Sequence, residues 1–330
     1  MTFLPLNLAP GKYGLRYFSN DGYTVLAQTN FTVVSGTVAK ALAPAGDLTV
    51  MTFNIWVQGT KGYGGLPAVA NAIAKADADV VGLQESSSAT TLQVLALLKL
   101  KPGYGSAVAS GAAGVVSRYP ITKTYTANGV YGYGVRVQLP GKHDIRFFNS
   151  HLTAYPYEPY SVRDKRKLSG VLEDEQKTRL PEMQAILSKL ITDKNSDPCL
   201  PTFLVGDHNC PSHLDWTAAN ADQNFGVSLV WPVSDTLHKA GFRDLYREVH
   251  PDPVKTRGFT WTPGEPKNTF SSTDVHDRID MIYFLPVAKE RTTGRCRPTP
   301  TTRIRGPRIT ARWSSASTVS TSRVRCQEPT

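Results

Sequence analysis

The chain has 330 residues, of which 40% are hydrophobic and 19% are charged, and its formal net charge is +10. This length suits one large domain with an appendage, and the apolar content is ordinary for a globular protein. No apolar run is long enough to span a bilayer, and the first residues lack the basic-then-apolar pattern of a secretory signal. We therefore expect no membrane span. The sequence does not indicate the cellular compartment. An extracellular location is compatible with a chain truncated before Met1.

The positive charge is concentrated at the C-terminal end. Residues 285–330 carry a net charge of +8, because ten basic residues face only Glu290 and Glu328. The basic ones are Lys289, Arg291, Arg295, Arg297, Arg303, Arg305, Arg308, Arg312, Arg323 and Arg325. The remaining body has a net charge of only +2. Nucleic acid is possible as a partner, but the small net charge of residues 1–284 does not support it, since duplex DNA usually needs a basic surface.

The four cysteines do not predict a disulfide framework. Cys199 and Cys210 flank a predicted strand whose ends lie roughly 20 Å apart at ~3.3 Å per residue. A disulfide needs Cα atoms within about 7 Å, so we expect free thiols. Cys296 and Cys326 belong to the basic tail. The redox compartment and the oligomeric state stay open.

Residues 1–36 have the pattern of β-strands. Tyr13, Leu15 and Tyr17 alternate with other residues, and Asn20-Asp21-Gly22 supplies a hairpin turn. Because two or three strands are not stable alone, this segment is interpreted either as the partial remnant of a β-sandwich or as a hairpin packed on the main domain. Residues 37–46, rich in Ala, Pro and Gly, are predicted to be a linker.

The main body, residues 47–284, alternates short apolar strands with helices. We expect strands at 48–56, 80–85, 114–121, 144–152, 203–207 and 277–284, and helices around 69–76, 89–100 and 173–192. Residues 155–170, rich in Tyr, Pro and charge, are predicted to be a loop. Several strands follow one another without a helix between them, which favours a mixed α/β layered sandwich over a doubly wound parallel sheet.

Polar side chains end or interrupt the predicted strands. The run Phe203-Leu204-Val205-Gly206-Asp207-His208-Asn209 reads as a buried strand that ends in a carboxylate and an amide two residues apart, which leave it on one side. Singly this pattern is typical of a turn. Asn54, Glu85, His151 and Asp280 stand at other strand ends, and converging strand ends would form a cleft.

Such a set suits phosphoester hydrolysis assisted by Mg²⁺ or Mn²⁺. Glu85 offers a carboxylate to the ion, which would keep several waters and polarise a phosphoryl oxygen. Asp207 would orient the attacking water, Asn209 would hold a phosphate oxygen, and His151 would donate to developing charge. Each residue also has a structural interpretation: a turn for Asn54, a solvated acid for Glu85, a satisfied histidine for His151, and a pair with Arg278 or another neighbour for Asp280.

Six motifs resemble, in order and spacing, the endonuclease/exonuclease/phosphatase superfamily with the DNase I-like fold. They are Met51-Thr52-Phe53-Asn54, Gly82-Leu83-Gln84-Glu85, Ser117-Arg118-Tyr119-Pro120-Ile121, Ser150-His151-Leu152, Gly206-Asp207-His208-Asn209 and Arg278-Ile279-Asp280. The resemblance implies a four-layered α/β sandwich with mixed, largely antiparallel sheets. It places Asn54 and Glu85 at the metal, and His151, Asp207, Asn209 and Asp280 in catalysis, with Asp280 orienting a second histidine.

The sequence does not decide the roles of several other residues near these motifs. His208 stands where the family commonly has an apolar aromatic, and it is either a packing substitution or an extra polar group at the cleft. His213 and His276 are interpreted as loop residues. Tyr155, Tyr157 and Tyr160 either stack on a substrate or pack on one another.

The second histidine of the family, carried by a final Ser-Asp-His, is absent after Phe284. Residues 286–330 contain no Leu, Phe or Tyr, so we expect a low-complexity tail that cannot bury a core strand. Codons permitted for Arg305 to Ser314, read in a shifted frame, spell Trp-Pro-Ser-Asp-His-Arg-Ala-Val-Val, and Trp313, which has one codon, fits. Our hypothesis is a frameshift after Phe284. The alternative is a native basic tail that binds anions or a membrane surface.

The sequence therefore predicts a metal-dependent phosphodiesterase or phosphomonoesterase that is impaired as written. A non-catalytic binding protein on the same scaffold and a nuclease acting on DNA or RNA are the alternatives.

Overall fold

The computed structural model describes residues 11–18, 25–33, 47–62, 64–98, 105–107, 113–126, 132–139, 143–196, 200–261, 275–287, 302–309 and 319–326. The chain divides into two compact units, Met1–Pro44 and Ala45–Thr330, and the division falls inside the predicted linker. None of the described helices is long and apolar enough to cross a membrane.

In the first unit, the described residues form one antiparallel pair of strands. Strand β1 (Gly11–Phe18) pairs with β2 (Val25–Val33), with Gly11 opposite Val33. The predicted turn at Asn20-Asp21-Gly22 lies outside the described residues. Strands were expected here, and the choice between a sandwich remnant and a hairpin stays a prediction.

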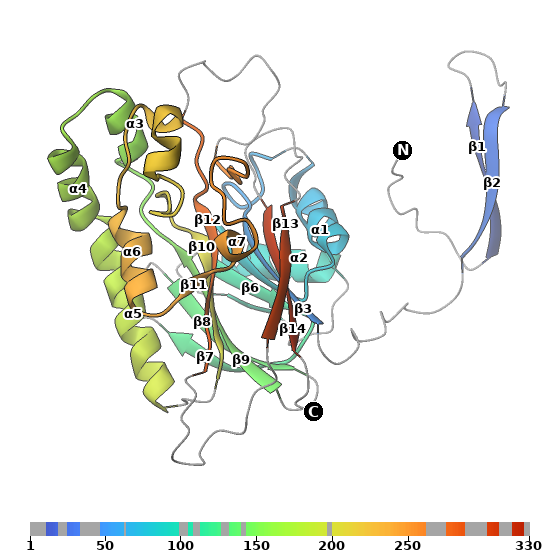
Figure 1. Ribbon diagram of the computed structural model, residues 1–330. Coiled ribbons are helices and arrows are strands. Elements are labelled where there is room, and N and C mark those ends of the chain that lie inside the picture. The colour runs from blue at the N-terminus through green and yellow to red at the C-terminus, as the bar shows by residue number, and fades with distance from the viewer. Residues whose placement is uncertain are drawn as a thin grey trace. The chain divides into compact units, whose positions relative to one another are not determined.

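The second unit is built on two six-stranded sheets (Figure 1). The β10 sheet has the order β11 (Arg243–Asp244), β12 (Asp280–Leu285), β10 (Thr202–Asp207), β9 (His143–His151), β8 (Gly132–Leu139) and β7 (Ile121–Thr126). The β4 sheet has the order β13 (Thr302–Ile309), β14 (Val319–Cys326), β3 (Asp47–Asn54), β4 (Val80–Gln84), β6 (Ala113–Ser117) and β5 (Gly105–Ala107). Only β9–β10 and β3–β4 are parallel among the pairs described, so the sheets are mixed and largely antiparallel, as predicted.

Four layers follow from the alternation of side chains along the strands. Phe203 and Val205 of β10 face Val50 and Val80 of the other sheet in the central core. The opposite faces are covered by helices, because the next residue along each strand points the other way. Leu204 packs under α5 (Arg179–Ser196) and α6 (Pro232–Lys239), whereas Val81 and Leu83 pack under α1 (Gly65–Ala76) and α2 (Ser88–Leu97). The predicted four-layered α/β sandwich is confirmed.

The helical prediction needs correction at two places between residues 155 and 196. The predicted loop 155–170 contains α3 (Glu158–Arg163), which has Pro159 in its first turn, where proline is tolerated. The predicted helix 173–192 is two helices, α4 (Leu168–Lys177) and α5, separated at Thr178, whose φ of −107° and ψ of −91° are not helical. The short elements η2 (Ala218–Asn224) and α7 (Leu245–Val249) complete the fold.

The tail was expected to supply no strand, and here the structure differs. Strand β14 pairs antiparallel with β3, and β13 pairs with β14 at the edge of the sheet. Ladder hydrogen bonds come from the backbone, so a polar sequence can form them, and Pro307 falls in the register shift between Arg305 and Arg308. The frameshift hypothesis concerns the gene and stays a prediction.

A buried amide ties the two sheets together beneath the strand ends. Asn149 of β9 donates from Nδ2 to the carbonyl oxygens of Leu83 and Gly114, each at 2.8 Å, and its Oδ1 accepts from Gln84 Nε2. Gly82 lies against it, since a Cβ there would stand 2.9 Å from Asn149 and 2.6 Å from Val205. These contacts fix the position of β9 relative to β4.

A close contact between β10 and β9 yields a stability prediction. A Cβ at Gly206 would lie 2.0 Å from the carbonyl oxygen of Ser150, so Gly206→Ala must push the strands apart. We expect a loss of about 1–3 kcal/mol in the free energy of unfolding, measured by urea denaturation. Gly132→Ala is the matched control, because its Cβ would meet atoms no nearer than 3.4 Å. Equal stability of the two variants would contradict the prediction.

Candidate active site

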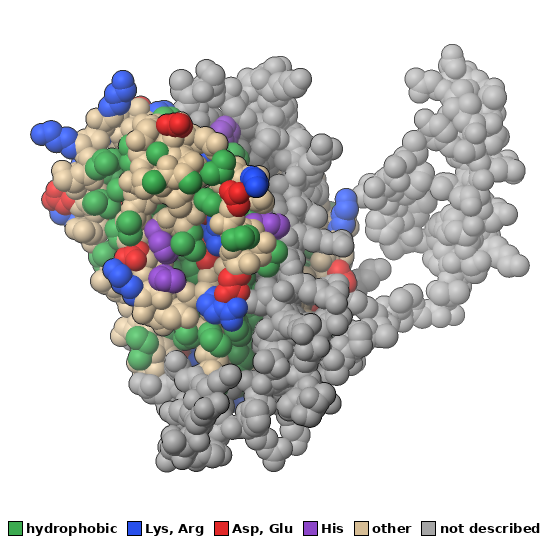
Figure 2. Space-filling model, in the orientation of Figure 1, with side chains coloured by type: hydrophobic (Ala, Val, Ile, Leu, Met, Phe, Trp, Pro, Cys, Tyr) green, Lys and Arg blue, Asp and Glu red, His purple; other side chains and the backbone are tan. Residues whose placement is uncertain are grey.

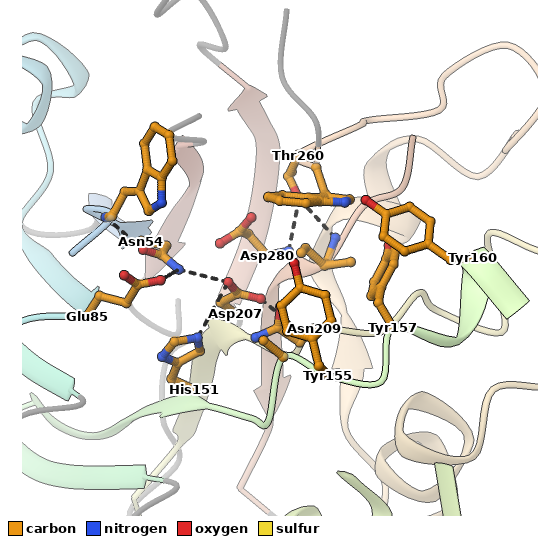
Figure 3. Close-up of a pocket in the computed structure, with 14 residues that line it drawn as sticks. Asn54, Glu85, His151, Tyr155, Tyr157, Tyr160, Asp207, Asn209, Thr260 and Asp280 are labelled. Atoms are coloured by element: carbon orange, nitrogen blue, oxygen red, sulfur yellow. Dashed lines mark hydrogen bonds and ion pairs between the residues drawn. The ribbon is translucent and has the colours of Figure 1, made fainter. Parts of the chain in front are cut away.

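All six predicted site residues line one pocket at the strand ends, with a cavity of about 200 Å³ (Figure 3). Asn54 and His151 are the last residues of β3 and β9, Asp207 ends β10, and Glu85 follows β4. Asp280 opens β12, which runs antiparallel to β10 and places Asp280 directly opposite Asp207. The topology thus brings together groups that are far apart in the chain: Asn54, Glu85, His151, Asp207, Asn209 and Asp280.

Asn54 stands between two carboxylates. Its Nδ2 donates to Glu85 Oε1 at 3.0 Å and to Asp207 Oδ2 at 2.9 Å, while its Oδ1 accepts from the backbone N–H of Trp56 at 2.9 Å. The amide nitrogen, and not the oxygen, is therefore directed at the carboxylates. In this arrangement Asn54 orients the predicted metal ligand Glu85.

The loop after Asn54 holds Glu85 from the other side. The Val57 N–H donates to Glu85 Oε2, and the Gln58 N–H donates to the Glu85 carbonyl oxygen. Trp56, Val57 and Gln58 have φ values of 50°, 49° and 58°, and Glu85 itself has a φ of 54°. Consecutive left-handed residues, one of them β-branched, cost conformational energy, and such strain is concentrated at functional sites.

The two buried aspartates face each other across the β10–β12 ladder. Burial raises the pKa of Asp207, although His151 and the Asn54 amide oppose the rise. Burial and the negative charge of Asp207 raise the pKa of Asp280 well above its ordinary value. Asp280 Oδ1 is buried and has no hydrogen-bond partner among the described residues. The raised pKa values reflect the cost of keeping two neighbouring carboxylates charged in a buried position.

His151 and Asn209 complete the polar half of the pocket. His151 Nε2 lies 3.8 Å from Asp207 Oδ2. The Asn209 backbone N–H donates to Asp207 Oδ1, and its side-chain Nδ2 donates to the Leu152 carbonyl oxygen, both at 2.9 Å. Asn209 has a φ of 50°, a conformation that asparagine tolerates better than most residues. The turn after β10 thus positions both its acid and its amide.

Three histidines flagged in the sequence do not line this pocket. His208 is buried, stacks on Tyr283 with ring centroids 5.8 Å apart, and lies 3.1 Å from Ser150 Oγ. Burial lowers its pKa to about 3, so it is a neutral packing residue. His213 contacts Ser234, and the ring of His276 lies 5.7 Å from that of Phe259.

Arg278 does not pair with Asp280, contrary to the structural interpretation of that motif. It forms buried ion pairs with Asp215 at 3.0 Å and with Asp244 at 2.6 Å. Asp215 also accepts from Arg247, so these four residues form a charge network behind the pocket. Asp280 is therefore not neutralised by Arg278, and it lines the pocket.

Sequence reasoning missed Thr260, Trp261 and Asp277. Thr260 Oγ1 accepts from the backbone N–H groups of Ile279 and Asp280, and Trp261 forms an isolated β-bridge with Asp277. Phe259 and Trp261 flank Thr260 in the sequence, and this alternation could have marked a short extended segment. The segment positions the start of β12.

The donor set fits a divalent cation. The described lining residues include the carboxylates of Glu85, Asp207 and Asp280 and no Lys or Arg. No group of three or more His, Cys, Asp or Glu side chains among the described residues is arranged to hold an ion by itself. Mg²⁺ usually binds through one or two carboxylates, waters and substrate oxygens, so the orphaned Asp280 Oδ1 and the neighbouring acids suit it.

Comparison with known proteins agrees with this geometry. The model of the Endonuclease/Exonuclease/phosphatase family matches residues 51–301. This chain belongs to that family. An uncharacterized protein of Caenorhabditis elegans is 29% identical over 265 residues, which cover 74% of this chain and 81% of that protein.

Solved structures share the fold at low identity. Truncated Caenorhabditis elegans TDP2 aligns with a TM-score of 0.52 and 17% identity, covering 85% of this chain and 98% of that one. A mannosyl-6-phosphatase of Bacteroides thetaiotaomicron aligns with a TM-score of 0.51 and 14% identity, covering 84% and 99%. At these identities the likeness establishes the DNase I-like fold, as the motifs predicted.

Asp277 gives this site a pH-dependent stability. Burial raises its pKa to about 6 from 3.8, even though Trp216 and Tyr157 both donate hydrogen bonds to it. The folded chain then binds the proton more tightly, so the stabilisation is present at low pH and is lost as pH rises through 6. Between about pH 4.5 and about pH 7.5, the free energy of unfolding of the unmodified chain should fall by about 2 kcal/mol more than that of the Asp277→Asn variant. Urea denaturation in metal-free buffer measures this; parallel pH profiles would contradict it.

Proposed function

We propose that this chain carries the active site of a divalent-metal-dependent phosphoesterase that hydrolyses a phosphodiester or a phosphomonoester. The observation that supports this most is the convergence, in one cavity, of polar groups from five strand ends. The family to which the chain belongs and the phosphatase among its structural neighbours are in keeping with it.

Charge explains why an ion is needed. A phosphate group is anionic, and the described part of the pocket offers it three carboxylates and no Lys or Arg. Bound Mg²⁺ or Mn²⁺ would neutralise this repulsion and polarise the phosphoryl oxygen. Glu85 is the proposed ligand. Asn54, the other residue predicted at the metal, donates hydrogen bonds to the carboxylates of Glu85 and Asp207.

In this proposal the remaining residues orient the attacking water and bind the phosphate. Asp207, held by Asn54 and by the Asn209 N–H, is placed to accept a proton from the attacking water. His151, beside Asp207, donates to the phosphoryl oxygens as charge develops there. The Asn209 amide orients the phosphate, and Asp280 orients the imidazole that the family pattern places next to it.

We further propose that the chain as written is impaired. Its sequence has no Ser-Asp-His after Phe284, and Asp280 Oδ1, which would bind that imidazole, has no partner among the described residues. Loss of one general acid or base costs about 10²–10⁴ in rate. Robust Mg²⁺-dependent turnover by the chain with this tail would refute the impairment.

The metal-dependent reaction is tested in a frame-restored chain that carries Trp-Pro-Ser-Asp-His-Arg-Ala-Val-Val. Hydrolysis of a bis-aryl phosphate should require Mg²⁺ or Mn²⁺ and stop with chelator. Asp207→Asn should lower kcat by about 10²- to 10⁴-fold because it removes the proton acceptor. Asp252→Asn is the control, since that carboxylate is 43% exposed and outside the pocket.

The same assay separates the alternatives. Metal and phosphate binding without turnover, in the frame-restored chain, would favour a non-catalytic binding protein. Cleavage of plasmid DNA at rates above those for small phosphoesters would favour a nuclease. The face in Figure 2 shows basic and acidic side chains interspersed, so the described surface in this view offers no continuous basic patch for duplex DNA.

Free imidazole tests the impairment. If the chain as written lacks only an imidazole beside Asp280, added imidazole should raise its rate in a saturable manner, whereas pyrazole, a far weaker base, should not. Asp280→Asn should abolish the effect, because the amide cannot hold the imidazolium. An equal increase in the variant would show that imidazole acts from bulk solvent and would refute the role of Asp280.

A further inference from the structure

The pocket has an aromatic half beside its polar half. Its lining includes Trp56, Tyr155, Tyr157, Tyr160 and Trp261. In Figure 3 the three tyrosines lie on the opposite side of Asp207 from Glu85 and Asn54. A phosphate held between Glu85 and Asp207 would therefore direct one of its ester groups toward these rings. We call Tyr155, Tyr157, Tyr160 and Trp261 the aromatic wall.

The aromatic wall is held in place from behind. The Tyr157 hydroxyl donates to the buried Asp277 carboxylate at 2.8 Å, and Asp277 pairs with Trp261 through both backbone groups. The Tyr157 ring meets Tyr160 edge-on at 5.0 Å and Trp261 at 6.3 Å. Rings fixed in this way lose little conformational entropy when a ligand binds.

The segment that carries Tyr155 is fixed as well. Arg179 of α5, itself buried, donates to the carbonyl oxygens of Thr153 at 2.7 Å and Pro156 at 2.6 Å. Glu182 accepts from the Thr153 N–H at 2.9 Å. The Tyr155 side chain between these anchors is nevertheless 66% exposed. A large aromatic ring displayed on an anchored loop at a polar pocket is available to a ligand, so packing among the tyrosines does not account for it.

The charges beside the aromatic wall favour a neutral ligand group. The Arg163 guanidinium already lies 4.8 Å from the centre of the Tyr160 ring. Both oxygens of Asp277 accept hydrogen bonds, one from Tyr157 and one from Trp216, so that carboxylate is not offered to a ligand. Arg163 is paired with the Asp164 carboxylate at 2.8 Å, so the described residues on this side offer a quaternary ammonium group no unpaired carboxylate. A planar uncharged ring would stack on the tyrosines.

We propose that the aromatic wall is a subsite for a planar aromatic ring in the ester group of the substrate. The inference rests on the proposed phosphoesterase function and narrows its substrates to aryl or nucleoside phosphoesters. Tyr155 and Tyr160 are the residues that determine this specificity.

The test is ligand binding by the full chain with Mg²⁺, because binding does not require turnover. Benzylphosphonate and cyclohexylmethylphosphonate are matched in charge and size and differ in aromaticity. We expect benzylphosphonate to bind about 2- to 10-fold more tightly, measured by calorimetry. Comparing thymidine 5′-phosphate with 2-deoxyribose 5-phosphate shows whether a nucleobase or only a smaller aryl group fits.

Substitutions in the aromatic wall test whether it causes the preference for benzylphosphonate over cyclohexylmethylphosphonate. Tyr155→Leu and Tyr160→Leu should each reduce it, whereas Tyr155→Phe should retain it. Phe225→Leu is the control, since that ring is 44% exposed and outside the pocket. Equal affinities for the matched phosphonates, or tighter binding of phosphocholine, would overturn the inference.

Inorganic phosphate separates the two proposals. If phosphate binds with Mg²⁺ but no aromatic preference is found, the inference about the wall fails and the proposed function stands. If phosphate itself does not bind in the presence of Mg²⁺, the proposed function fails and the inference fails with it.

Discussion

The site depends on one buried amide that joins two sheets. The Asn149 side chain donates to backbone carbonyls of β4 and β6 and accepts from Gln84, so the side-chain amide of a residue in the β10 sheet has all its described hydrogen-bond partners in the β4 sheet. A buried polar group left unpaired costs about 1–3 kcal/mol, so sliding one sheet over the other is strongly disfavoured. Asn149 lies two residues before His151, and Gln84 immediately precedes Glu85. The amide that fixes the sheets therefore also fixes the two sides of the pocket.

Among its described residues, the pocket contains buried carboxyl groups, left-handed residues and an unpaired polar atom, which are features that a protein core normally avoids. Asp207 and Asp280 are buried carboxylates with raised pKa values, Glu85 and Asn209 are left-handed, and Asp280 Oδ1 has no partner among the described residues. Each of these features costs folding free energy, and the surrounding sheets must offset it. A divalent cation bound beside Asp207 and Asp280 would offset the cost of the buried carboxylates. The Arg278 network shows the contrast, because there the buried arginine is paired with Asp215 and Asp244, and none of the three lines the pocket.

In the C-terminal tail, the contribution of the backbone to the sheet can be distinguished from the contribution of the side chains to the site. Strands β13 and β14 extend the β4 sheet through ladder hydrogen bonds, which any sequence without proline at a paired position can make. What the tail sequence lacks is a chemical group, the imidazole that the family pattern places beside Asp280. Backbone pairing therefore extends the sheet whatever side chains the tail carries.

Because the alternation of apolar residues is a local pattern, the sequence by itself predicted a mixed α/β layered sandwich, and the resemblance of six motifs implied its four layers. The six polar residues singled out at predicted strand ends line one pocket, and their roles stay predictions. The sequence did not reveal the break at Thr178, the buried state of His208 or the partners of Arg278, which depend on residues distant in the chain. Nor could it show that Asn54 directs its nitrogen toward Glu85 and Asp207, or that Asp277 supports Tyr157. Tertiary structure decided these points, since the hydrogen-bond partner of a buried group is set by which strands and loops lie beside it.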